Sequence, residues 1–148
     1  MKTDNSIKNI TTAAIYRKIM NPEEWIYSKV CIENKSIEFE LKENELPIFR
    51  ISSPNAKTII TTRRIIEKNE SGIESVNFED IDVLVYGNFK GSINKVELQI
   101  FRIIDDFGKE YNFQMETGKA SIGLINAVNT VLKLKSINPK KSINPSLR

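Results

Sequence analysis

The sequence predicts an α+β protein that is mainly β, with a run of antiparallel strands closed by one C-terminal helix. Three observations predict this class. Apolar and polar residues alternate through much of residues 36–115, as in strands with one buried face. Polar turns that contain glycine, at Gly72 and Gly108, separate these stretches. After Gly118 the spacing of apolar side chains becomes helical.

The N-terminal segment predicts one or two helices that precede the strands. Residues 7–20 place isoleucines and alanines at helical spacing. Asn21 followed by Pro22 is typical of a second helix start, because asparagine caps helices and proline fits the first helical position. We therefore expect residues 1–33 to form a helical extension.

Seven strands are expected in meander order after this extension. Residues 36–42 alternate between apolar and charged side chains, which favours a half-buried strand. Residues 57–67 are rich in isoleucine and threonine, which favours one long strand. The strands are expected at residues 36–42, 47–51, 57–67, 73–78, 81–86, 95–104 and 109–115.

The C-terminal helix is expected to pack against this sheet. Leu124, Val128 and Leu132 form one apolar stripe, and such a stripe must be buried against another element. Beyond it, residues 135–148 hold four basic residues and no acid. We expect them to form a flexible basic tail, in which the sequence SINP occurs twice.

The charge of the chain argues against a nucleic-acid-binding domain. The formal net charge is +3, and removing the four cations of the tail leaves −1 for residues 1–134. The body is therefore nearly neutral, without the basic excess of a domain that binds nucleic acid. The tail alone could attract a polyanion or an anionic membrane.

The single cysteine indicates a reducing compartment. Cys31 has no second cysteine to form an intrachain disulfide with, so a cytoplasmic location is expected. Its neighbours Val30 and Ile32 are apolar, a setting that raises a thiol pKa and predicts a buried, unreactive side chain. The first residues also lack the apolar stretch of a secretory signal.

The middle of the chain resembles a known family. Residues 60–66 read ITTRRII, a turn follows at Gly72, and residues 76–81 read VNFEDI. This order is similar to the third to fifth strands of bacterial PH-like and GRAM-like domains, over roughly residues 36–134. The resemblance implies a pleckstrin-homology-like barrel of about seven antiparallel strands, over residues 34–134, capped by the C-terminal helix. Functions in this superfamily are diverse, so the site must decide the function.

Basic residues near the strand ends are the candidate contacts to a partner or a phosphate. In lipid-binding PH domains such residues surround the first hairpin, where Lys42 and Arg50 flank the expected loop. Glu43 and Glu45 in that loop would repel a polyphosphate, which argues against specific phosphoinositide binding. The candidates are Lys42, Arg50, Arg63, Lys90 and Lys95.

Arg63 and Arg64 are not expected to form one pocket. Neighbouring residues of a regular strand point to opposite faces of the sheet. One arginine is therefore expected to reach a carboxylate, such as Glu79 or Asp80, while the other lies exposed.

Catalysis and metal binding have little support. The chain has no histidine and no spaced set of oxygen ligands, although Glu79, Asp80 and Asp82 are close in sequence. No glycine-rich loop has the spacing that binds nucleotide phosphates. We expect no cofactor, no metal and no enzyme activity.

The sequence favours a non-enzymatic interaction module that binds a protein partner or self-associates. An antiparallel sheet with open edges can add a strand from a partner. The alternative is a peripheral, GRAM-like binder of anionic membrane lipid that uses Lys90, Lys95 and the basic tail. A small-ligand pocket or an enzyme is the least supported class.

Overall fold

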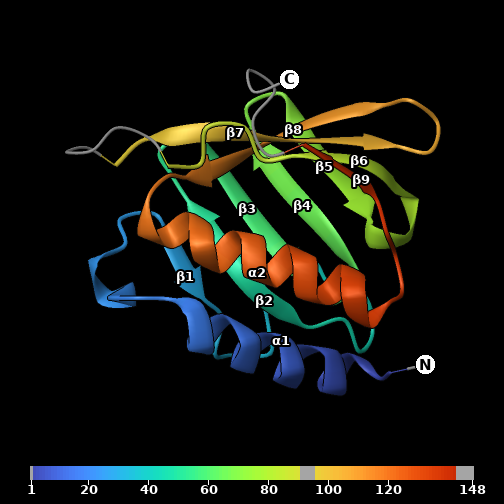
Figure 1. Ribbon diagram of the computed structural model, residues 1–148, viewed down its shortest axis with the longest axis horizontal. Helices are drawn as coiled ribbons and strands as arrows, with labels where there is room; N and C mark the ends of the chain where they lie inside the picture. Colours follow the sequence, from blue (N-terminus) through green and yellow to red (C-terminus); the bar gives the residue numbers. More distant parts are fainter. Residues whose placement is uncertain (1, 91–95, 143–148) are drawn as a thin grey trace.

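The computed structural model describes residues 2–90 and 96–142 of the chain, which form two β-sheets and two α-helices (Figure 1). The helices are α1 (Asp4–Lys18) and α2 (Lys119–Leu134), and two 3₁₀ turns are η1 (Pro22–Glu24) and η2 (Phe78–Asp80). The strands are β1 (Ser28–Val30), β2 (Pro47–Ser52), β3 (Ala56–Thr61), β4 (Arg64–Asn69), β5 (Gly72–Asn77), β6 (Ile81–Val85), β7 (Leu98–Asp105), β8 (Glu110–Glu116) and β9 (Lys140–Ser142).

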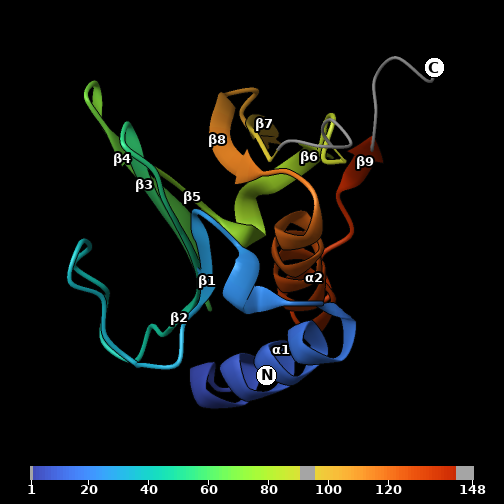
Figure 2. The same ribbon diagram turned by 90° about the vertical axis from the view of Figure 1, so that its left-hand side faces the viewer.

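The strands form two sheets that η2 joins in sequence. Sheet A has the order β1-β2-β3-β4-β5, with every neighbouring pair antiparallel. Sheet B has the order β8-β7-β6-β9, in which β9 pairs in parallel with β6 and the other pairs are antiparallel. Figure 2 shows the two sheets at an angle, with α2 in the opening between them and α1 against α2.

The hydrophobic core lies where α2 meets both sheets. Phe49 of sheet A and Phe113 of sheet B are fully buried, together with Leu124 and Val128 on α2. The apolar stripe predicted for the C-terminal helix is therefore confirmed as its buried face. Burial of this kind contributes about 25 cal/mol per Å² of apolar surface and is the main force that holds the sheets together.

A glycine in the middle of α2 allows the helix to approach closely. A Cβ on Gly123 would lie 2.9 Å from Phe49 Cε2 and 3.0 Å from Trp25 Cη2. Glycine in a helix costs about 1 kcal/mol relative to alanine. Here it makes room for two aromatic rings, which pack with centroids 5.9 Å apart.

The α+β, mainly β class is confirmed, and the described residues form two open sheets rather than a closed barrel. A polar seam, made of Ser53, Thr58, Glu67 and Gln114, joins β8 to sheet A in place of a backbone ladder. Glu67 Oε1 accepts the backbone N–H of Gln114 at 2.8 Å, where a neighbouring strand would offer a carbonyl. The Gln114 side chain donates to Thr58 Oγ1 at 2.9 Å and accepts from Ser53 Oγ at 2.7 Å.

The single strand predicted for residues 57–67 is wrong, because the chain turns at Thr62 and Arg63 to form β3 and β4. Thr61 causes this break. Its hydroxyl accepts the backbone N–H groups of Arg63 at 3.1 Å and Arg64 at 3.0 Å. Local bonding of threonine to the backbone competes with the strand ladder. A β-branched run therefore became a tight hairpin.

The strand predicted for residues 36–42 is also wrong, because this segment is part of the loop between β1 and β2. The alternation of apolar and charged residues in this segment still reflects the burial of two side chains. Phe39 is buried and Leu41 is partly buried, and both pack on Ile59 and Ile66 on the outer face of sheet A. Ile37, in contrast, is 98% exposed. The loop covers sheet A with two side chains and adds no strand.

The N-terminal segment contains one α-helix, α1, rather than two. The predicted second helix is limited to the three residues of η1, and Asn21 adopts a left-handed conformation without a side-chain cap. The chain then extends into β1, which pairs with β2. The Glu116 carboxylate holds the chain in this extended conformation, because it accepts hydrogen bonds from the N–H of Tyr27 at 2.8 Å and from the hydroxyl of Ser28 at 2.8 Å.

The start of the predicted flexible tail is held in place. Lys135 is only 16% exposed in its side chain, and residues 140–142 form β9 beside β6. Most of the second SINP copy, at residues 142–145, lies outside the described residues.

Candidate functional site

Two of the five candidate cations lie at the same cleft. Lys42, in the loop before β2, and Arg63, in the β3–β4 turn, both line it. Arg50 lies on the outer face of sheet A, with Nη1 4.0 Å from Glu33 Oε1. Lys90 follows β6 and is exposed, and Lys95 lies outside the described residues. The structure thus selects Lys42 and Arg63 from the predicted set.

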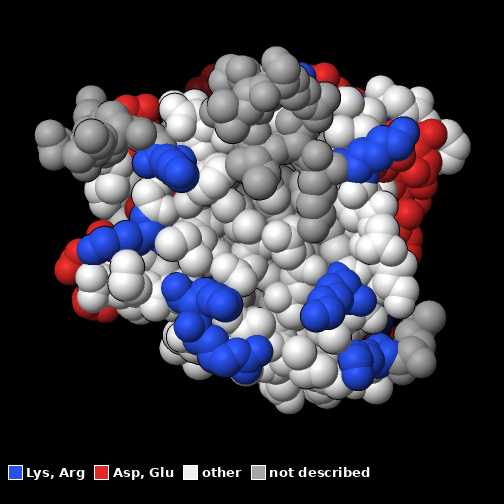
Figure 3. Space-filling model, in the orientation of Figure 1, with Lys and Arg blue, Asp and Glu red and all other residues white. Residues whose placement is uncertain are grey.

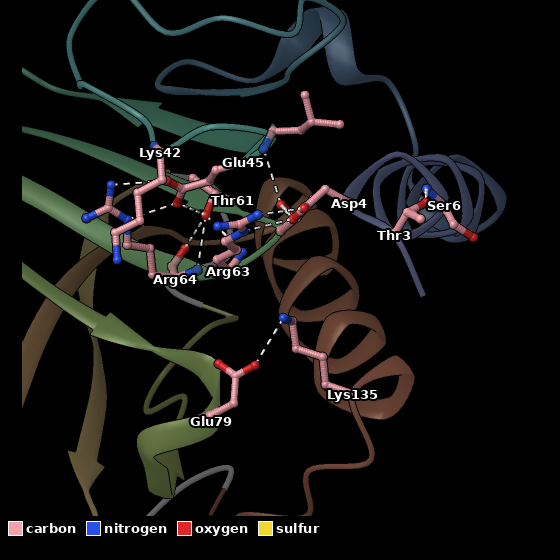
Figure 4. A network of polar contacts seen from close by, with 12 residues as sticks. Thr3, Asp4, Ser6, Lys42, Glu45, Thr61, Arg63, Arg64, Glu79 and Lys135 are labelled. Atoms are coloured by element: carbon pink, nitrogen blue, oxygen red, sulfur yellow. Dashed lines mark hydrogen bonds and ion pairs between the residues drawn. The ribbon is translucent and has the colours of Figure 1, made fainter. Parts of the chain in front are cut away.

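The cleft has a volume of about 580 Å³ and opens where five parts of the chain meet. These parts are the N-terminal end of α1, the loop before β2, the β3–β4 turn, the end of β5 with η2, and the C-terminal end of α2 (Figure 4). The lining residues are Lys2, Asp4, Ile7, Lys42, Arg63, Asn77, Glu79, Leu134, Lys135 and Ser136. We call this site the basic cleft.

Arg63 is fixed by a two-point contact with Asp4 at the start of α1. Its Nε and Nη2 donate to the two carboxylate oxygens at 3.2 and 3.0 Å. Burial opposes the ionisation of Asp4, but hydrogen bonds from Arg63 and Thr62 outweigh it, so the pKa of Asp4 lies below its usual value. Thr3 caps this end of α1 by accepting the N–H of Ser6 at 3.2 Å.

Lys135 crosses from the end of α2 to η2 on the other side of the cleft. Its Nζ lies 3.1 Å from Glu79 Oε2. Figure 4 shows this pair set apart from the pair of Arg63 and Asp4. Each wall of the cleft therefore carries one internal ion pair.

The basic cleft retains an excess of positive charge. Its four cations are Lys2, Lys42, Arg63 and Lys135, and its two acids are Asp4 and Glu79, which leaves a formal charge of +2. Lys2 and Lys42 are exposed, and neither forms an ion pair within residues 2–90 and 96–142. These two ammonium groups are therefore available to an anionic ligand.

A buried carboxylate holds the loop that carries Lys42. Glu45 is 3% exposed and accepts the backbone N–H of Lys42 at 2.9 Å. It also accepts Arg64 Nε at 2.9 Å and the Thr61 hydroxyl at 2.6 Å. Burial opposes its ionisation, but these hydrogen bonds outweigh burial and lower the pKa of Glu45. Glu45 thus fixes the loop from within.

Sequence reasoning placed Glu45 wrongly as a loop acid that repels phosphate. It lies inside the protein and is neutralised by Arg64, so it does not oppose an anion at the surface. One of Arg63 and Arg64 was expected to reach a carboxylate and the other to lie exposed. In the structure each meets a carboxylate, and the side chain of Arg63 is 37% exposed. The partners are Asp4 and Glu45 rather than Glu79 or Asp80, and the local pattern gives no sign of contacts so distant in sequence.

Cys31 offers no reactive thiol. It is 2% exposed, and burial, with the nearby Glu33 carboxylate, raises its pKa to about 12. The buried, unreactive cysteine predicted from Val30 and Ile32 is thus confirmed. Within the described ranges, no three His, Cys, Asp or Glu side chains are grouped so as to hold a metal ion.

No protein family, curated protein or solved structure matches this chain. Neither α1 nor α2, the α-helices of the described chain, is long and apolar enough to cross a membrane.

Proposed function

We propose that the protein is a non-enzymatic interaction module of PH-like fold that binds an acidic segment of a protein partner in the basic cleft. The observation that carries the proposal is the pair of exposed cations, Lys2 and Lys42, at a cleft of about 580 Å³ with a formal charge of +2. Charge-assisted hydrogen bonds to carboxylates are about twice as strong as neutral ones.

The lining favours carboxylates flanked by apolar groups over a polyphosphate. Ile7 and Leu134 contribute apolar surface to the cleft, which suits the side chains of a peptide. Asp4 and Glu79 place two negative charges in the same lining. Arg63 and Lys135 already pair with these acids, so Lys2 and Lys42 are the two cations left for a ligand, and a phosphate cluster needs more charge-assisted donors than two.

A fluorescein-labelled peptide of alternating glutamate and leucine tests this proposal by fluorescence anisotropy. We expect binding that weakens with added salt, since the cations are exposed. The double variant Lys2→Glu/Lys42→Glu should weaken it by about tenfold or more, which corresponds to about 1.4 kcal/mol.

The matched control is Lys29→Glu/Lys68→Glu, which makes the same charge change at exposed lysines on sheet A. It should change the affinity by less than about twofold. Equal losses in both double variants, or equal binding of a lysine–leucine peptide, would refute the cleft as the site.

The outer side of α1 supports a second candidate function, peripheral binding to an anionic membrane. Ile10 and Tyr16 are exposed on α1 and Met20 just after its end, next to the exposed Arg17 and Lys18. Basic groups beside exposed apolar and aromatic groups are the pattern of interfacial helices. Figure 3 shows basic side chains spread over the face formed by α1 and α2, with acidic ones mainly at its rim.

Vesicle co-sedimentation separates the two candidates. Membrane binding requires sedimentation with phosphatidylserine vesicles but not with phosphatidylcholine vesicles, and its loss in Arg17→Gln/Lys18→Gln. The variant Lys29→Gln/Lys68→Gln is the control of equal charge. The cleft proposal instead predicts that the α1 variant keeps its affinity for the acidic peptide.

A further inference from the structure

The outer edge of β5 is an open strand edge. β5 is the last strand of sheet A and pairs only with β4. Five of its six residues are exposed, and Ile73 is 63% exposed. The opposite edge strand, β1, has only three residues, and on β8 the N–H of Gln114 already bonds Glu67. β5 is therefore the longer and more exposed of the two edges of sheet A.

The hairpin geometry shows which backbone groups point outwards. Asn69 pairs with Gly72 across a two-residue loop, so these residues exchange hydrogen bonds and the pattern alternates from there. The N–H of Phe78 donates to the carbonyl of Arg63 at 3.1 Å, in agreement with this alternation. The N–H and C=O groups of Ile73, Ser75 and Asn77 therefore point away from β4.

β5 lacks most of the usual protections of an edge strand, and Glu74 is the one charge on it. Proteins guard exposed edges with proline, charged residues (above all lysine), bulges or very short strands. The sequence of β5 is GIESVN, which has neither proline nor lysine. Its register with β4 continues without a shift from Arg64 opposite Asn77 to Asn69 opposite Gly72. A partner strand would meet a regular and uninterrupted ladder.

We propose that two copies of the chain pair β5 to β5, antiparallel, about a two-fold axis at Ser75. This register sets Ile73 opposite Asn77 and Ser75 opposite its own copy, so the outward groups form about six backbone hydrogen bonds. Two sheets A then become one continuous sheet across an isologous interface. The interface and the basic cleft share Asn77, at the end of β5, but the interface does not use Lys2 or Lys42, whose charges carry the proposed cleft function.

The charges on β5 favour this register over its neighbour. With the axis at Ser75, Glu74 lies opposite Val76 of the second copy. A shift of the axis to Glu74 would set two carboxylates directly opposite each other, and like charges at such positions are destabilising. Glu74 also has a cation nearby, because Lys109 Nζ lies 3.5 Å from its Oε2. The midpoint of the strand thus gives both the most bonds and the least repulsion.

Sedimentation velocity of the full chain tests the interface with the variant Ser75→Pro. Proline removes the N–H of residue 75, which points outwards, so no bond to β4 is lost. We expect the wild-type protein to sediment as a dimer and Ser75→Pro as a monomer, while Ser75→Ala, which keeps the N–H, stays dimeric. A monomeric wild type, or a dimer that survives the proline, would overturn the proposal.

A second variant covers the case in which Ser75→Pro fails to fold. Ile73→Lys places a charge on the exposed edge and should also give a monomer. Ile100→Lys is its control, because Ile100 is a similarly exposed isoleucine on β7, and it should stay dimeric. In hydrogen exchange, the amides of residues 73, 75 and 77 should exchange slowly in the wild type and faster in Ile73→Lys. Equal exchange in the two proteins would contradict the interface.

Discussion

Two buried glutamates beside the β3–β4 hairpin have nearly the same setting and opposite behaviour. Glu45 accepts the hydroxyl of Thr61 at 2.6 Å, and Glu67 accepts the hydroxyl of Thr58 at 2.8 Å. Glu45 also meets the guanidinium of Arg64 at 2.9 Å. In the part of the chain that the structure describes, Glu67 forms no ion pair, and its second partner is the backbone N–H of Gln114.

The pKa values of these two carboxyls move in opposite directions. Burial is the largest influence on both. For Glu45 the hydrogen bonds from Arg64 and Thr61 outweigh burial, and its pKa falls below the usual value. For Glu67 burial outweighs the neutral donors, and its pKa rises. At Glu67 the neutral hydrogen bonds do not offset the loss of water, whereas at Glu45 the guanidinium of Arg64 helps to do so.

The difference matches what each glutamate does in the fold. Glu45 and Arg64 hold the loop that carries Lys42 beside the basic cleft. Glu67 joins sheet B to sheet A by capping Gln114 of β8. The charged pair of Glu45 and Arg64 thus supports the candidate site, and the polar seam that contains Glu67 joins the two sheets.

The largest expected effect is that of Arg64→Met. This change leaves the Glu45 carboxylate buried without its cation and should lower the free energy of unfolding by about 3–5 kcal/mol. Chemical denaturation measures it. The double variant Glu45→Gln/Arg64→Met removes the stranded charge and should recover part of the loss. A loss below about 1 kcal/mol in the single variant would show that Arg64 is not what stabilises Glu45.

Arg63→Met should have a smaller effect than Arg64→Met, although both arginines contact a carboxylate. The side chain of Arg63 is 37% exposed, so water screens its contact with Asp4. We expect a loss of about 1 kcal/mol or less, and a coupling of similar size in a double-mutant cycle with Asp4→Asn. A loss as large as that of Arg64→Met would contradict the role assigned to burial.

Glu67→Gln should have the opposite effect from the two arginine variants and raise the free energy of unfolding at neutral pH. The raised pKa means that the folded state disfavours the ionised carboxyl. Glutamine is neutral, and its Oε1 can accept from both Thr58 and Gln114, as that of Glu67 does. Thermal unfolding measures the difference. Glu67→Leu, which loses both acceptors, should destabilise the protein and serves as the contrast.

The smallest effect is the pH dependence of these differences. For Glu67, the advantage of glutamine should be present above the raised native pKa and fade as pH falls through that pKa toward 4.5, its value in the unfolded chain. For Glu45, the stability that it contributes should be full above 4.5 and be lost as pH falls through its lowered native pKa. The free energies of unfolding of Glu67→Gln, Glu45→Gln and the wild type, measured across this pH range, test both trends. If the difference from the wild type changed in the same direction with pH for both variants, the comparison would be refuted.

The sequence predicted well wherever a pattern is local and periodic. The stripe of Leu124, Val128 and Leu132 identified α2, and the glycine turn at Gly72 identified the β4–β5 hairpin. It failed at Thr61, where a side chain bonds the backbone and turns the chain, because β-branched composition favours a strand on either side of such a turn. The strand prediction also failed for residues 36–42. Alternating apolar and polar residues indicate which side chains are buried, but they do not indicate whether the backbone pairs with another strand.

By itself the sequence determined the mainly β class, the amphipathic C-terminal helix and the buried, unreactive Cys31, since each follows from neighbours within a few residues. Only the tertiary structure decided which charges meet. Glu45 and Arg64 are nineteen residues apart, and Arg63 is fifty-nine residues from Asp4. Pairings at that range depend on how the hairpin, loop and helices pack, because side-chain contacts act over a few ångströms and local patterns do not encode them.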